Sequence, residues 1–238
     1  MMIDAIDLSQ FAMNVDQLKL QTLSHNTANI NTPGYKKEHL ELNAFSELLG
    51  ADITHALEHV DKALINTQGA LNQTNKTTDI ALSGAGYFQV QGEYGTFFTR
   101  RGDFHLNAQG ELVTATGERV QGLSGTIQLD GDSFSIDRQG VISINQQKID
   151  QLFIAHFEHP EHLIEIGNGL YQTEEAPENA AGHTKILQGF LEQANTKSVD
   201  EMLEMVSTSR HFEACQRILR TADTMLAGAI NQLGEGNV

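Results

Sequence analysis

The chain has 238 residues, of which 15 are Lys or Arg and 31 are Asp or Glu, and its formal net charge at pH 7 is −16. This acidity argues against nucleic acid and anionic membrane surfaces as partners. The sequence has no apolar run long enough for direct membrane insertion, and residues 1–30 lack the pattern of a signal peptide. Hydrophobic residues make up 39 % of the chain and Trp is absent, which indicates one or two domains with modest cores.

The first predicted element is a helix near the N-terminus. Its apolar residues recur at alternating spacings of three and four, which places them on one seam: Leu8, Phe11, Val15, Leu18 and Thr22. The segment that follows is polar. Pro33 biases Thr32 away from helical geometry, so the helix should end near Ile30.

The middle of the chain changes period. Residues 36–77 are ambiguous, and short helices are compatible with residues 40–49 and 53–64. From residue 78 onward, short strand-like runs alternate with Gly-containing turns, which predicts a mostly antiparallel β module. The runs are residues 80–82, 87–90, 96–99, 104–106, 112–114 and 152–157. Residues 104–110 and 134–140 repeat one pattern of strand, tight turn with Gly, and strand.

The last predicted element is a long helix from Ser198 to Leu233, roughly 50 Å in length. Ser198 and Glu201 form the pattern of a capping box. A narrow seam of alternating large and small residues follows: Met205, Thr208, Phe212, Cys215, Leu219, Ala222, Leu226, Ala229 and Leu233. Such a seam favours a partner helix, and the N-terminal helix is the candidate; packing on the chain's own globular core is the alternative.

Four stretches together resemble a known family. Residues 26–36 read NTANINTPGYK, similar to A-N-N-L-A-N-x-x-T-x-G-F/Y-K/R near the N-terminus of bacterial flagellar axial proteins. Residues 67–90 resemble the family's T-Q-G-x-L and G-x-G-F-F-x-V segments, and residues 98–114 its Y-T-R-x-G-x-F and G-x-L-V-T segments. Residues 188–195 resemble x-G-x-L-E-x-S-N. The matching positions include Asn26, Asn29, Thr32, Gly34, Gly84, Gly86, Arg100, Gly102, Gly110, Leu191, Glu192 and Asn195.

These observations predict an α+β fold. Long N- and C-terminal helices would form an antiparallel, coiled-coil-like pair, and a mostly antiparallel all-β domain would be inserted between them. We expect a terminal helical domain from residues 1–35 and 186–238, a connecting segment at 36–77 and a β domain at 78–185.

The resemblance implies a structural subunit of the flagellar basal-body rod, exported without a cleaved signal peptide and polymerising helically into a tubular drive shaft. Its implied partners are copies of itself, neighbouring rod or hook subunits and the flagellar export apparatus. The implied interface is the helix seam: Leu8, Phe11, Val15, Leu18, Met205, Phe212, Leu219, Leu226 and Leu233. A hook or hook-basal-body accessory subunit is the alternative, but only about a hundred residues are available for outer domains, which favours the rod. Proximal and distal rod positions both stay open.

Two histidine patterns would suit metal or catalytic chemistry. His55 and His59 fit the H-x-x-E-H spacing of an inverted zinc-protease motif, which makes a zinc-dependent hydrolase an alternative. Acidic, solvated residues flank this segment, and a third ligand is missing from the pattern. His156, His159 and His162 fit a wet loop between two strands. We therefore expect no catalytic, cofactor-binding or metal site.

Overall fold

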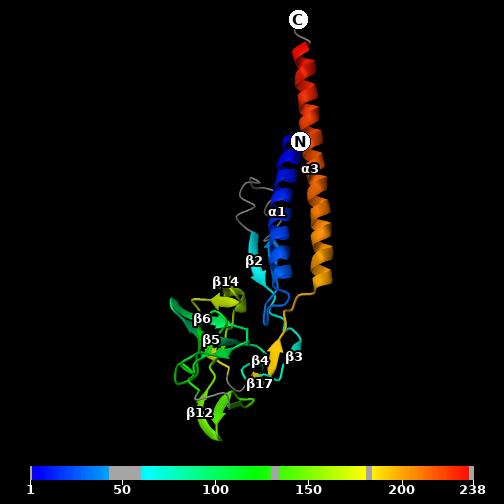
Figure 1. The fold of residues 1–238 in the computed structure, drawn as a ribbon. Coiled ribbons are helices and arrows are strands. Elements are labelled where there is room, and N and C mark those ends of the chain that lie inside the picture. The colour runs from blue at the N-terminus through cyan, green and yellow to red at the C-terminus, as the bar shows by residue number, and fades with distance from the viewer. Residues whose placement is uncertain (1, 43–59, 130–133, 181–183, 236–238) are drawn as a thin grey trace. The chain divides into compact units, whose positions relative to one another are not determined.

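A computed structural model describes residues 2–42, 60–129, 134–180 and 184–235 (Figure 1). The chain divides into two compact units. We call residues 1–28, 38–63 and 197–238 the helical unit, and residues 29–37 and 64–196 the β unit. Within the described ranges, no helix combines the length and apolarity needed to cross a membrane.

The helical unit contains two long helices and a small sheet. Helix α1 spans Met2–Ala28 and helix α3 spans Ser198–Glu235, while strands β1 (Glu38–Leu42) and β2 (Val60–Leu64) pair with each other. The two helices lie side by side (Figure 1). Asp16 contacts His211, and Lys19 contacts Glu204, so residue numbers rise along one helix as they fall along the other.

Two local features of this unit differ from the sequence expectation or settle what it left open. Helix α1 ends at Ala28 rather than near Ile30, because the chain turns immediately afterwards, with the Thr32 N–H bonded to the Asn29 carbonyl at 2.9 Å. Strands occupy residues 38–42 and 60–64, where short helices had been compatible with the sequence, because mutual pairing of β1 and β2 outweighs local propensity. The rest of that segment, with the His55 and His59 motif, lies outside the described residues.

The start of α3 agrees with the sequence to the residue, but its cap does not. The Glu201 N–H donates to the Lys197 carbonyl at 3.1 Å, so the cap position is Lys197, one residue earlier than predicted. The Ser198 hydroxyl instead lies 3.9 Å from the Met202 sulfur.

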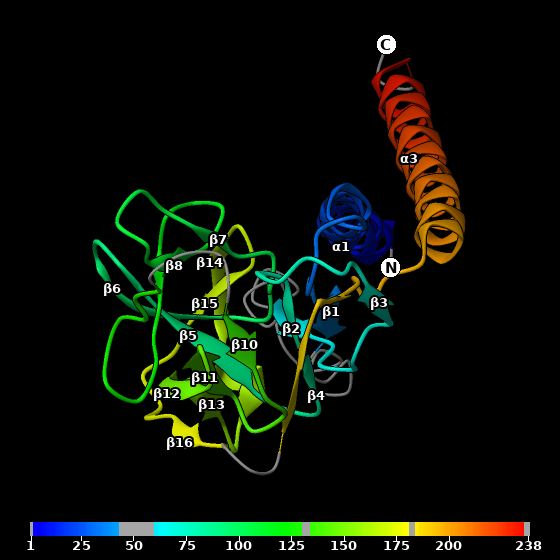
Figure 2. The same ribbon diagram turned by 60° about the horizontal axis from the view of Figure 1, so that its bottom comes forward.

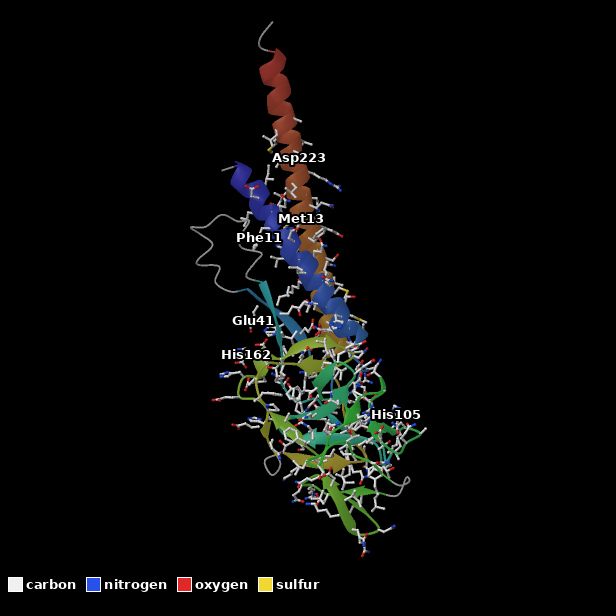
Figure 3. All side chains as sticks on the ribbon, turned by 90° about the vertical axis from the view of Figure 1, so that its left-hand side faces the viewer. Phe11, Met13, Glu41, His105, His162 and Asp223 are labelled. Carbon is white, nitrogen blue, oxygen red and sulfur yellow. The ribbon has the colours of Figure 1, made fainter. Side chains whose placement is uncertain are left out.

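The predicted seam of α3 is recognisable in the structure. Met205, Thr208, Phe212, Cys215, Leu219 and Ala222 are all buried or half-buried, whereas Leu226 is 38 % exposed and the side chain of Leu233 lies outside the described part. In α1, Phe11, Val15 and Leu18 are half-buried but Leu8 is 52 % exposed. Phe11 projects from α1 in Figure 3. The most buried positions of α1 are Ser9, Asp16, Thr22, Leu23 and Asn26, so its buried face is more polar than the seam predicted.

The β unit consists of short antiparallel strands (Figure 2). A nine-stranded sheet has the order β14-β15-β6-β5-β9-β8-β7, with β13 on β5 and β16 on β13; β10-β11-β12, β17-β4 and β18-β3 form smaller sheets. The strands are β3 Leu71–Gln73, β4 Ile80–Ser83, β5 Tyr87–Gly92, β6 Gly95–Thr99, β7 His105–Leu106, β8 Leu112–Val113, β9 Arg119–Val120, β10 Ser135–Ile136, β11 Val141–Ile144, β12 Gln147–Gln151, β13 Ile154–His156, β14 Ile164–Gly167, β15 Leu170–Gln172, β16 Glu178–Asn179, β17 Lys185–Gln188 and β18 Phe190–Glu192.

Alternation along β5 divides the apolar residues of the β unit between two clusters. Phe88 and Val90 join a large core cluster with Phe104, and the Phe88 and Phe104 rings meet edge to face at a centroid distance of 5.1 Å. Tyr87 points to the opposite side, into a smaller cluster with Tyr171 and four further residues: Phe98, Ala155, Phe157 and Leu163. This is the period-two pattern expected of a strand buried on both faces.

The repeated turn pattern is real in three dimensions. The Asn107 side-chain oxygen accepts from the N–H groups of Gln109 and Glu111, both at 2.9 Å. Asp137 does the same for Gln139 and Val141, at 2.9 and 2.8 Å. Gly110 and Gly140 close the two turns with φ of 77° and 84°. A side-chain acceptor at the first turn position and a residue with positive φ at its end explain why the two sequences match.

Candidate assembly site and buried charged cluster

Asn26, the first of the motif residues, joins three parts of the helical unit. It is fully buried; its amide nitrogen donates to the Glu38 carbonyl at 2.9 Å and to Glu201 Oε2 at 3.3 Å. Its side-chain oxygen accepts from the Glu38 N–H at 3.0 Å. One amide side chain thus ties α1 to β1 and to the first turn of α3, so its hydrogen bonds are made inside the chain.

Polar side-chain pairs supplement the apolar contacts between the two helices. The Asp16 carboxylate, on the buried face of α1, lies 2.6 Å from His211 Nδ1, and Lys19 Nζ lies 2.9 Å from Glu204 Oε1. Cys215 is buried one turn beyond His211, and burial, followed by the nearby Asp16 charge, raises the pKa of its thiol. Because the side chains of Lys19, Glu204 and His211 are each more than 40 % exposed, these pairs add little to stability.

A second apolar surface on α3 is uncovered in the single chain. Val199, Met202, Leu203 and Val206 are 68, 54, 65 and 51 % exposed, and their spacing places them on one side of the helix. This side differs from the seam that contains Met205 and Thr208. We call these four residues the exposed apolar stripe. Large side chains grouped in this way, rather than scattered, are typical of a surface that another protein covers.

The β unit contains a buried cluster of three charged side chains, which we call the charged cluster: Lys36, Arg100 and Glu192. Lys36 Nζ lies 2.6 Å from Glu192 Oε1, and Arg100 Nε lies 2.7 Å from Glu192 Oε2. All three residues are 5 % exposed or less. The Gly69 N–H is the third donor to the carboxylate, 3.0 Å from Oε1, so the carboxylate is well satisfied.

Backbone carbonyls complete the coordination of both cations. Lys36 Nζ donates to the Thr67 carbonyl at 3.0 Å, and the Arg100 guanidinium donates to the carbonyls of Gly84, at 2.5 Å, and of Gly86. Burial lowers the pKa of the Lys36 ammonium, and the ion pair with Glu192 opposes that shift. Such saturation is what a buried ion pair needs in order to offset its desolvation.

Two further motif residues, Gly34 and Asn195, form hydrogen bonds next to this cluster. The Gly34 N–H donates to the Glu192 carbonyl at 2.7 Å. Asn195 accepts from the Lys37 N–H at 2.7 Å and donates to the Ile65 carbonyl at 2.6 Å. The segments 34–37 and 191–195, far apart in sequence, are thereby held together inside the β unit.

Gly102 marks a close approach between backbones. A Cβ atom built at this position would lie 1.6 Å from the Ile80 carbonyl oxygen, and the Ile80 N–H donates to the Gly102 carbonyl at 3.0 Å. No side chain fits there. Leu191, Asn29 and Thr32 are half-buried and contribute no group to the charged cluster.

The histidine loop does not gather into a metal-binding arrangement. His159 Nδ1 lies 3.0 Å from Glu161 Oε1, and the rings of His159 and His162 are 5.3 Å apart. Both are exposed, and His162 projects outward in Figure 3. His156 sits on β13 in a cavity of about 330 Å³ together with Tyr87 and Arg100.

Sequence patterns mark the motif residues as family markers or assembly contacts, but they do not reveal the charged cluster. Lys36 lies 156 residues from Glu192 in the sequence, and Arg100 lies 92 residues from it, so no local spacing connects the members of the cluster. The one available signal is that a Lys, an Arg and a Glu each occur in a different motif-like segment, but Lys37 and Arg101 lie beside two of them, so the sequence does not single out the buried charges.

Three regions of the chain match profiles of known protein families. The profile of the flagella basal body rod protein family matches residues 6–36, that of the flagellar hook protein FlgE/F/G D1 domain matches residues 81–144, and that of the flagellar basal body rod FlgEFG protein C-terminal region matches residues 187–233. Each matched region supplies one member of the charged cluster.

Full-length relatives agree. The flagellar basal-body rod protein FlgG of Bacillus subtilis is 32 % identical over 248 residues, which cover 90 % of this chain and 93 % of that protein. FlgG of Buchnera aphidicola subsp. Baizongia pistaciae is 27 % identical, over 94 % of this chain and 98 % of its own. The rod protein FlgF of Rhizobium meliloti is 29 % identical, over 95 % of both. This chain therefore belongs to the flagellar basal-body rod protein family.

Proposed function

We propose that this rod subunit polymerises helically through α1 and α3, with copies of itself and with neighbouring rod or hook subunits, to build the tubular shaft between basal body and hook. Its role is structural rather than catalytic. In this proposal the two helices act as an antiparallel, coiled-coil-like pair, the β unit is an insertion between them, and the subunit leaves the cell through the flagellar export apparatus without a cleaved signal peptide.

The observation that carries the proposal is the exposed apolar stripe. The seam of α3 is at least half-buried from Met205 to Ala222. The four residues of the exposed apolar stripe, in contrast, are exposed to solvent on another side of the helix. Full burial of such a side chain contributes about 1.5–3 kcal/mol. A contact that repeats from subunit to subunit without closing on itself would cover the stripe and produce a filament.

Complementation tests this assignment. A strain that lacks the native gene should stay non-motile when it carries Leu203→Asp, because a carboxylate on the stripe opposes burial against a neighbour. Leu203→Met keeps the apolar surface and should restore swimming. Both purified variants should keep the wild-type circular dichroism, since position 203 is exposed within the chain. Normal swimming of the Leu203→Asp strain would show that the stripe is not an assembly surface.

A further inference from the structure

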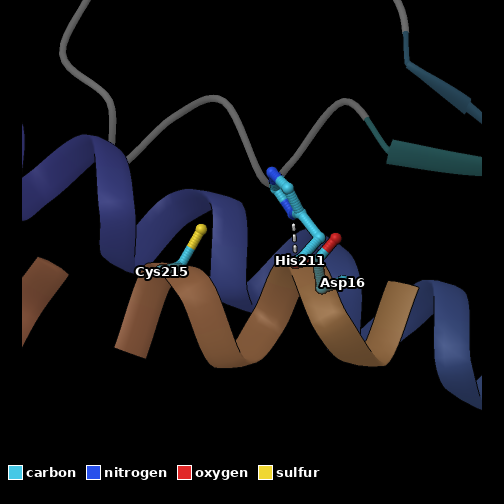
Figure 4. Close-up of side chains that lie close together, drawn as sticks. All are labelled: Asp16, His211 and Cys215. Atoms are coloured by element: carbon cyan, nitrogen blue, oxygen red, sulfur yellow. Dashed lines mark hydrogen bonds and ion pairs between the residues drawn. The ribbon is translucent and has the colours of Figure 1, made fainter. Parts of the chain in front are cut away.

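A cluster of three metal-ligating side chains lies between the two helices of the helical unit. His211 and Cys215 are four residues apart on α3 and so share one face, and Asp16 approaches them from α1 (Figure 4). One potential ligand atom from each residue lies within 4.8 Å of the other two. The rotamers of Asp16 and His211 already converge, with Nδ1 and Oδ2 2.6 Å apart.

We propose that Asp16, His211 and Cys215 form a binding site for a thiophilic divalent cation, Zn²⁺ in the first place, which fastens α1 to α3. Nitrogen, sulfur and carboxylate ligands suit Zn²⁺, whereas Ca²⁺ and Mg²⁺ require oxygen ligands. Zn–ligand bonds of about 2.0–2.3 Å place tetrahedral ligand atoms about 3.3–3.7 Å apart. To reach that geometry, His211 Nδ1 and Asp16 Oδ2, which are 2.6 Å apart, would move apart, and the Cys215 sulfur, which is within 4.8 Å of both ligand atoms, would approach them.

Charge balance supports a metal ion over the bare side chains. Without metal, the buried Asp16 carboxylate faces an imidazole, which supplies a positive charge only when it is protonated, and a thiol. With Zn²⁺, one carboxylate, one thiolate and a neutral imidazole sum to zero charge, and a neutral complex is the form that a buried site tolerates best. Binding releases the thiol proton, together with the second imidazole proton when His211 carries one.

Exposure indicates where a fourth ligand would enter. Asp16 and Cys215 are buried, while the His211 side chain is 60 % exposed, so one side of the site faces solvent. Three protein ligands and one water would complete a tetrahedral ion. Sequence spacing cannot reveal this site, because Asp16 and His211 are 195 residues apart.

Cobalt spectroscopy on the full-length protein tests the proposal directly. The protein is stripped with a chelator, kept reduced with a phosphine and titrated with Co²⁺. We expect a thiolate-to-cobalt charge-transfer band and tetrahedral visible bands that saturate at equimolar Co²⁺ and disappear when Zn²⁺ is added. Cys215 is the only thiol in the chain, so the band identifies its sulfur as a ligand without any variant. Absence of the band would overturn the proposal.

Variants then test the other two ligands. Asp16→Asn and His211→Ala should each weaken Zn²⁺ binding by at least about tenfold, because even groups that only orient a ligand change affinity 10–100-fold. His105→Ala removes an exposed imidazole of the β unit and serves as the matched control; it should bind Zn²⁺ like the wild type. A double substitution, His159→Ala with His162→Ala, should also leave the cobalt band unchanged. Unchanged affinity in Asp16→Asn and His211→Ala would refute this ligand set even if the thiol binds cobalt.

Discussion

Replacing Glu192 by Ala should destabilise the β unit far more than the loss of an exposed charge. The carboxylate accepts from Lys36 Nζ, Arg100 Nε and the Gly69 N–H at 2.6, 2.7 and 3.0 Å, and its side chain is 1 % exposed. Its removal leaves two cations buried without a counter-ion. Breaking a buried pair in this way costs about 3–5 kcal/mol. We expect a loss at the upper end of that range, because one carboxylate serves both cations.

Tyrosine signals make the measurement specific to one unit. All four tyrosines belong to the β unit; Tyr35, Tyr87 and Tyr171 are buried in it, and Tyr94 is exposed. Because Trp is absent, near-ultraviolet circular dichroism during guanidinium unfolding follows the β unit, whereas the far-ultraviolet signal also reports the helices. The tyrosine transition should move to lower denaturant with an unchanged slope, which is the signature of a stability change alone.

Two substitutions calibrate the result. Glu192→Gln keeps the side-chain volume and one oxygen acceptor but also removes the counter-ion of both cations, so it should cost nearly as much as Glu192→Ala, about 3 kcal/mol. Glu174→Gln removes an exposed carboxylate of the same unit and should change stability by less than about 0.5 kcal/mol. If Glu192→Ala unfolds at the same guanidinium concentration as Glu174→Gln, the charged cluster does not stabilise the β unit.

Three further predictions use the same assay. Gly102→Ala should lower the stability of the β unit by about 3 kcal/mol or more, because its Cβ would meet the Ile80 carbonyl, and the tyrosine midpoint reports it. Burial raises the pKa of Tyr87 to about 12. The unfolded state therefore loses this proton at lower pH than the folded state. The free energy of unfolding should fall between about pH 10 and 12 by up to about 1.4 kcal/mol per pH unit, and it should fall less steeply in the Tyr87→Phe variant. Deletion of residues 198–238 removes α3 but none of the β unit, so the tyrosine midpoint should persist.

Each of these has a result that would contradict it. Gly228→Ala, which meets no atom within 4 Å, is the control for Gly102→Ala, and equal midpoints for the two would refute the close-approach argument. A Tyr87→Phe variant with the wild-type alkaline profile would show that Tyr87 does not ionise late. Loss of the tyrosine transition after deletion of 198–238 would show that the β unit needs α3 to fold.

Much of the β unit could be predicted from local patterns. The strand expected at residues 87–90 is β5, Tyr87–Gly92, and the one at 96–99 is β6, Gly95–Thr99. The alternation of apolar and polar residues and the turn residues are local signals, so these strands can be predicted without information on the rest of the chain. The start of α3 at Ser198 is predictable for the same reason.

The features that sequence patterns missed depend on partners far away. Strand β1 exists because Val60–Leu64 pairs with it, and neither segment has a strong strand pattern of its own. The buried face of α1 includes Asp16 and Asn26, which periodicity rules assign to solvent. Both are buried because acceptors and donors on α3 and β1 reach them, Glu201 from 175 residues away.

The charged cluster explains why the motif-like segments belong together although each is weak alone. Lys36 follows α1 in the chain, Glu192 precedes α3, and Arg100 lies in the middle of the β unit. The two ion pairs of Glu192, together with the bond from Gly34, join the segment that leaves one terminal helix to the segment that enters the other. A β unit that unfolded would release both segments at once. The buried ion pairs therefore hold segment 34–37 against segment 191–195. Apolar contacts alone would hold the two segments in a less specific register.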